Sequence, residues 1–163
     1  MSPQKKLWGI ARLGWLSGYG LLAFLWGVHA EWAWAALAVI LGGLSIVSSY
    51  GSRTWLGSLH FLALLVLSGV ATVWNSWIAL CSVLSGVSAW DLELFARRLE
   101  PFSDPPREIV RTHLKRLGAI ALLSGILGAI ALSLPVSLGF GWILLVAFGF
   151  LLVFSLLLRQ GLL

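Results

Sequence analysis

Long apolar segments separated by short polar ones run along nearly the whole chain. Helices are predicted at about 7–30, 32–49, 55–73, 76–100, 105–133 and 138–159. The segments are continuously apolar, whereas the strands of a membrane β-barrel alternate apolar and polar residues. Helices also satisfy their own backbone hydrogen bonds in lipid. The pattern therefore predicts an all-α, polytopic membrane protein, in which residues 1–163 form a single domain with a bundle of six transmembrane helices.

The break between the third and fourth helices must be inferred, because Trp55–Ala89 contains no formally charged residue. At about 1.5 Å per residue, one helix of this length would be too long for a hydrocarbon core about 30 Å thick. We place the turn at Trp74-Asn75-Ser76-Trp77, since Asn and Ser favour turns and Trp favours membrane interfaces. Merging the two helices would put the basic loop on the opposite side from the basic N-terminus, which disfavours a bundle of five.

One polar segment, residues 91–116, interrupts the apolar pattern and holds 11 of the chain's 17 charged residues. We expect a short cytoplasmic insertion of two helices, hinged at Pro101–Pro106 and each continuous with a membrane helix. Asp104 is suited to cap the second of these helices, with Pro105 at its first position.

Composition supports a membrane location and orients the chain. Only 10% of the residues are charged and 60% are hydrophobic, whereas soluble domains carry about 25% charged residues. Six crossings place every Lys and Arg on one side, so the net charge of +5 reflects the cytoplasmic excess of basic residues rather than nucleic-acid binding. We expect a multi-pass protein of the cell membrane with both termini in the cytoplasm.

The first apolar segment imitates a signal peptide, because Val28-His29-Ala30 resembles a cleavage site. We interpret this segment as a retained first transmembrane helix. The Trp residues fall towards the two ends of the predicted helices, as in the aromatic belts of membrane proteins. An aromatic cage for a cationic ligand is the less favoured interpretation of the same residues.

Small residues at four-residue spacing indicate which helices touch. Such ridges occur on three predicted helices, at Gly14 and Gly18, at Ser82 and Gly86, and at Ala121, Gly125 and Ala129. Small side chains let helix backbones approach closely and pack without a hydrophobic driving force. We expect these ridges to pack within the bundle, and packing between subunits is the alternative.

His60 and Asp91 form the candidate intramembrane polar pair. Each lies fourteen residues from the predicted turn, at Trp74 and Trp77 respectively, so antiparallel helices would bring them to the same depth. A His–carboxylate pair could relay protons or bind a cation. The simpler interpretation, which we favour, is that Asp91 marks the point where the helix leaves the membrane and that His60 is an interfacial side chain. Haem binding through His60 is a weaker alternative.

The second predicted cytoplasmic helix carries the main basic surface. Arg107, Arg111 and Lys115 recur every four residues, hence on one face, and Arg116 adjoins them. We expect these residues to meet anionic lipid headgroups, each contributing about 1 kcal/mol near the surface. Docking of an acidic partner or a phosphorylated ligand is the alternative.

Motifs of catalysis are not found in this sequence. It contains no HExxH, GxSxG or P-loop pattern, and the single Cys81 excludes an intrachain disulfide. Asp91 and Glu93 should point to different sides of a helix, which disfavours a two-carboxylate metal site. We expect no enzyme, cofactor or metal, but a non-catalytic membrane subunit or scaffold that binds a membrane protein partner or a second copy of itself. The alternative is a small transporter or channel, proton-linked or not, that uses His60 and Asp91.

Overall fold

The computed structural model describes residues 3–48, 54–102 and 106–133, and these residues are all-α. They form five helices: α1 (Pro3–Val28), α2 (Trp32–Ser48), α3 (Thr54–Ala71), α4 (Ser76–Arg98) and α5 (Arg107–Ser133). The chain divides into two compact units, Met1–Leu132 and Ser133–Leu163, and the five helices belong to the first apart from the last residue of α5. The predicted sixth helix, residues 138–159, and the predicted cap Asp104-Pro105 lie outside the described residues.

Two tight turns at the same end of the bundle reverse the chain. Between α1 and α2, Ala30 adopts a left-handed backbone with φ 60°, and the amide of Glu31 donates to the Trp26 carbonyl at 2.8 Å. This is the hydrogen-bond pattern of a Schellman cap, with alanine where glycine is usual. Between α3 and α4, the Asn75 side chain caps α4 by accepting from the amides of Trp77 and Ile78 at 3.0 and 3.1 Å. Local hydrogen bonds in these turns therefore end α1 and begin α4.

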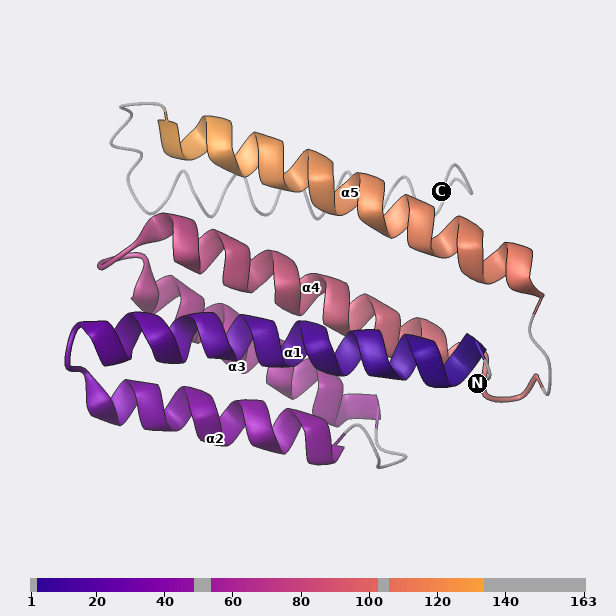
Figure 1. The fold of residues 1–163 in the computed structure, drawn as a ribbon, viewed down its shortest axis with the longest axis horizontal. Coiled ribbons are helices and arrows are strands. Elements are labelled where there is room, and N and C mark those ends of the chain that lie inside the picture. The colour runs from indigo at the N-terminus through magenta and orange to yellow at the C-terminus, as the bar shows by residue number, and fades with distance from the viewer. Residues whose placement is uncertain (1–2, 49–53, 103–105, 134–163) are drawn as a thin grey trace. The chain divides into compact units, whose positions relative to one another are not determined.

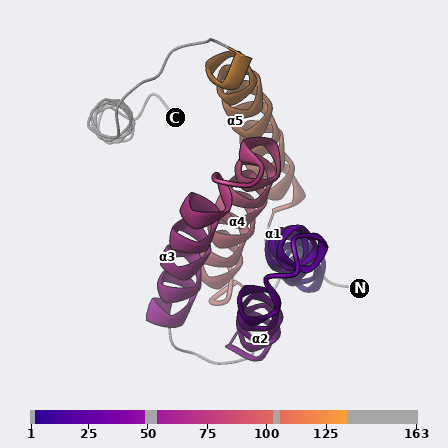
Figure 2. The same cartoon turned by 90° about the vertical axis from the view of Figure 1, so that its left-hand side faces the viewer.

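Helix α1 lies between α2 and α4 and makes the most extensive contacts of the described helices (Figure 1). Its most extensive contacts are with α4 on one side and α2 on the other, while α3 packs mainly on α4. Large side chains of α1 fill the core, since Trp15, Tyr19, Leu22 and Trp26 are all at most 1% exposed. Seen along the helices, α5 lies on the far side of α4 from α3 and is not part of this core (Figure 2).

The contact between α1 and α4 is a seam of small residues. A Cβ added to Gly14 would lie 2.9 Å from the Cβ of Ala89, and one added to Gly18 would lie 3.2 Å from the Ser82 carbonyl oxygen. Two α4 hydroxyls cross this seam: Ser82 Oγ donates to the Gly18 carbonyl and Ser85 Oγ to the Gly14 carbonyl, both at 2.9 Å. Close backbone approach and interhelical hydrogen bonds therefore act at the same positions.

A second apolar cluster joins the beginnings of α1 and α5 to the end of α4. Its buried members are Leu7, Ala11, Leu92, Ala96, Leu99 and Val110. Because these helix ends meet, every Lys and Arg of the described part of the chain lies at one end of the bundle, which we call the basic end: Lys5, Lys6, Arg12, Arg97, Arg98, Arg107, Arg111, Lys115 and Arg116. The helices extend from this end as predominantly apolar segments.

The opposite end is aromatic. The rings of Trp26 and Trp34 lie 5.8 Å apart, and those of His29 and Trp74 lie 6.4 Å apart. Two of the described helices, α4 and α5, are long and apolar enough to cross a membrane, and α2 and α3 are shorter apolar helices. This supports a helical bundle with two possible spans.

Gly14→Ala should destabilise the bundle, whereas Gly20→Ala on the same helix should not. The new methyl at residue 14 must displace the Ala89 Cβ, while one at residue 20 meets no atom within 4 Å. Overpacking of this kind typically costs about 1–3 kcal/mol. Thermal unfolding in detergent measures the difference, and equal unfolding midpoints for both variants would contradict the close approach of α1 and α4.

Candidate functional site

Glu93 is a carboxylate inside the bundle, only 3% exposed on α4. Its Oε2 accepts a hydrogen bond from Trp15 Nε1 of α1 at 3.2 Å, and its Oε1 accepts one from an Arg97 guanidinium nitrogen at 2.9 Å. Because a buried charge is expensive unless it is paired and hydrogen-bonded, these two donors account for the tolerance of Glu93 in the core. The pair follows from the i, i+4 spacing along α4.

Neighbouring elements hold this ion pair tightly. Helix α3 approaches through Gly57, where an added Cβ would lie 3.1 Å from Glu93 Oε1. The Arg97 guanidinium lies 5.2 Å from the centre of the Trp8 ring on α1, within the range of a cation–π interaction. Three helices therefore contribute to the surroundings of one carboxylate.

His60 of α3 lies beside this ion pair and is 9% exposed. Its ring centre is 6.4 Å from that of Trp15, the residue that donates to Glu93, and the two rings meet edge-on. The Tyr19 hydroxyl donates to the backbone carbonyl of His60 at 2.8 Å. We call Trp15, Tyr19, His60, Glu93 and Arg97 the buried polar cluster, which links α1, α3 and α4.

Asp91 lies on a different face of α4 and meets α5. Its Oδ2 is 2.7 Å from Nε2 of His113, and the His113 ring stacks on Phe95 with centres 3.7 Å apart. The two side chains of this pair are 40% and 26% exposed. Among the described residues no hydrogen bond or ion pair joins Asp91 to His60, so the structure does not bring the candidate pair together.

The facing of α4 explains this arrangement. His60 and Asp91 lie at the same number of residues from the turn at Asn75, but equal depth does not determine which neighbouring helix each residue faces. Residues 91 and 93 differ by about 200° around a helix, and as expected they point to different sides, Asp91 to α5 and Glu93 to α1. The Glu93–Arg97 spacing was the sequence signal for the buried pair, and the partner Trp15 carries no comparable signal.

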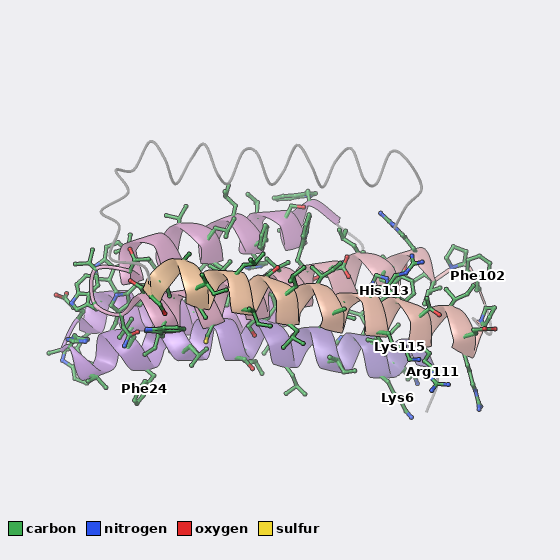
Figure 3. All side chains as sticks on the ribbon, turned by 90° about the horizontal axis from the view of Figure 1, so that it is seen from above. Lys6, Phe24, Phe102, Arg111, His113 and Lys115 are labelled. Carbon is green, nitrogen blue, oxygen red and sulfur yellow. The ribbon has the colours of Figure 1, made fainter. Side chains whose placement is uncertain are left out.

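The basic residues singled out in the sequence, Arg107, Arg111, Lys115 and Arg116, are all exposed on α5. Figure 3 shows Arg111 and Lys115 on the side of α5 that also faces Lys6, whereas His113 points to the other side. Lys6 of α1 and Arg111 and Lys115 of α5 thus lie on the same side, and we call these three residues the basic surface.

The small-residue ridge of α5 faces α4. Leu84 lies 3.6 Å from the position of a Cβ added to Gly125, and Leu80 fills the space beside Gly128. Ala121 and Ala129 are half-buried on the same side. On α4, Gly86 leaves room for Leu64 of α3 and therefore contributes to a third helix contact. The structure thus places all the predicted packing residues at contacts or half-buried positions inside unit Met1–Leu132.

An open groove lies between the end of α4 and the beginning of α5. It has a volume of about 500 Å³ and is lined by Phe95, Pro106, Glu108, Ile109, Thr112, His113 and Arg116. It combines apolar walls with groups of both charges, which suits an amphiphilic ligand better than a wholly apolar one. Within the described ranges, no three His, Cys, Asp or Glu side chains gather in a way that could hold a metal ion.

Glu93→Gln should destabilise the protein more than Asp91→Asn, although both replace a carboxylate by an amide on α4. The first removes the buried carboxylate charge that the Arg97 guanidinium meets at 2.9 Å, and hydrogen bonds to charged groups contribute about 1.5–3 kcal/mol. The second alters a partly exposed pair, for which about 0–1 kcal/mol is typical. Thermal unfolding in detergent compares the two, and a larger loss for Asp91→Asn would contradict the structural role of Glu93.

Comparison with known proteins identifies no relative from which a function could be transferred. No protein-family model matches the chain, and neither a curated protein nor a solved structure matches it.

Proposed function

We propose that the protein is a non-catalytic integral membrane subunit or scaffold. The observation that carries the proposal is that polar side chains inside the bundle form hydrogen bonds between helices. Ser82, Ser85 and Tyr19 each donate to a backbone carbonyl of a neighbouring helix, and Trp15 donates to Glu93. In a membrane, polar groups inside a bundle either form a path for a substrate or join helices. Here they join helices, as a fixed scaffold requires.

The placement of charge supports a membrane orientation. The basic end collects every Lys and Arg of the described residues, and the aromatic end carries the Trp26–Trp34 and His29–Trp74 pairs. Positively charged residues are retained on the cytoplasmic side of membrane proteins. We therefore place the basic end in the cytoplasm, and with the predicted sixth helix the chain crosses the cell membrane six times. The basic surface of α1 and α5 then meets anionic headgroups or an acidic partner.

The alternative is a small, proton-linked transporter or channel. One observation favours it: His60 and Glu93 are both buried in the bundle, and both contact Trp15. Intramembrane carboxylates and histidines are typical of proton relays. The tight approach of Gly57 and the pairing of Glu93 with Arg97 favour the scaffold instead, because they hold the carboxylate in one place.

Purification of the tagged full chain in a mild detergent distinguishes the two roles. A scaffold should co-purify with a membrane protein at a fixed stoichiometry, and the basic-surface variant Arg111→Gln/Lys115→Gln should retain less of any acidic partner than Leu122→Ala, an exposed control on α5. A homo-oligomer without a partner that moves protons in vesicles would favour the transporter and overturn the scaffold.

Thiol labelling tests the orientation. In a Cys81→Ser background, cysteines introduced at Glu31 and Asn75 should react with a membrane-impermeant maleimide added to intact cells, because both positions lie in the turns of the aromatic end. A cysteine at Glu100, in the turn after α4, should react only after the cells are opened. The reverse pattern would contradict the orientation, and labelling of all three in intact cells would contradict the membrane placement.

A further inference from the structure

The groove between α4 and α5 is lined by one face of α5, and the other faces of this helix have different neighbours. Four of its residues, Ile109, Thr112, His113 and Arg116, recur at three- and four-residue spacing and therefore share one face of the helix. Val110, Leu114 and Leu117 lie on another face and pack on the second apolar cluster. The basic residues Arg111 and Lys115 lie on yet another side, as Figure 3 shows. The four residues thus lie on a different side of α5 from the basic surface, whereas Glu108, seven residues before Lys115, lies at the edge between the two.

The face that lines the groove continues along α5 as an apolar stripe. Ile120, Leu123, Leu127 and Ile130 follow Arg116 at the same spacing and are 37–57% exposed. From Arg116 to Leu127 the helix rises about 16 Å, which corresponds to one leaflet of a hydrocarbon core about 30 Å thick. A polar groove followed by an apolar stripe one leaflet long has the dimensions of a single phospholipid with its headgroup at the basic end.

The charges in the groove indicate the kind of headgroup. Arg116 and the Thr112 hydroxyl lie next to the apolar stripe, where the phosphate of a lipid would be. Glu108 lies about two turns nearer the N-terminal end of α5, on the side where the outer part of a headgroup would extend. One cation and one anion in this order complement a phosphate followed by an ammonium group, whereas the basic surface is complementary to purely anionic lipid.

We propose that this groove binds one zwitterionic, amine-headed phospholipid, with the phosphate at Arg116 and Thr112, the ammonium group at Glu108 and an acyl chain along the stripe from Ile120 to Leu127. The proposal rests on the membrane placement inferred above. A lipid in this position would cover Phe95 and Ile109 and would brace the beginning of α5 against α4, next to the Asp91–His113 pair.

Native mass spectrometry of the full chain in detergent tests the proposal, with phosphatidylethanolamine, phosphatidylcholine and phosphatidylglycerol added in turn. One phosphatidylethanolamine should be retained in preference to the others. Arg116→Gln should weaken retention of all three lipids about tenfold, since loss of a charge-assisted hydrogen bond is of that order. Glu108→Gln should weaken only the preference for phosphatidylethanolamine, because it removes the partner of the ammonium group.

Lys115→Gln is the matched control, because it removes the same charge as Arg116→Gln from an exposed position on a different side of α5. This variant should keep the retained lipid and lose only adsorption to anionic vesicles. Equal retention of the three lipids by the unaltered protein, or an Arg116→Gln variant that binds like it, would overturn the proposal. A failed lipid test together with the expected thiol labelling rejects the groove alone, whereas failed labelling rejects the membrane placement.

Discussion

The close approach of α1 and α4 is the constraint on which the rest of the structure depends. Gly14 and Gly18 bring the α1 backbone against Ser82, Ser85 and Ala89, so that two serine hydroxyls reach α1 carbonyls. Each serine hydroxyl donates to an α1 carbonyl oxygen that also accepts a hydrogen bond within α1 itself. In an apolar environment, these bonds and van der Waals packing replace the hydrophobic effect as the force between helices. The depth and rotation of α4 relative to α1 are fixed by this seam.

The buried polar cluster follows from that rotation. With Ser82 and Ser85 facing α1, Glu93 two to three turns further along α4 also faces α1, where Trp15 donates to it. Arg97, one turn beyond, then reaches both Glu93 and the face of Trp8. Removing either charge breaks a buried ion pair, and the cluster therefore specifies one arrangement of α1, α3 and α4 rather than adding much net stability. Such an arrangement suits the proposed scaffold.

The basic end differs from this interior because most of its charged groups are exposed, whereas Arg97 belongs to both regions and is largely buried. Helix α5 contacts α4 through small residues, the Asp91–His113 pair and the second apolar cluster, and its remaining faces carry the basic surface and the groove. One side of α5 thus packs on the protein, another carries the basic surface and a third lines the groove. The proposed lipid contacts concern only sides of α5 that the described residues leave exposed.

The sequence by itself determined that the described chain is all-α, because only helices are compatible with long continuous apolar segments. It also determined which residues are small enough for close contact and that Asp91 and Glu93 point apart, since these follow from local spacing. The choice of partners was decided by the tertiary structure alone. Equal depth from the Asn75 turn left Asp91 free to meet either α3 or α5, and the rotation imposed by Gly14 and Gly18 turned it to His113 and turned Glu93 inwards to Trp15. Residue spacing defines the faces of a helix, whereas packing between helices defines what each face meets.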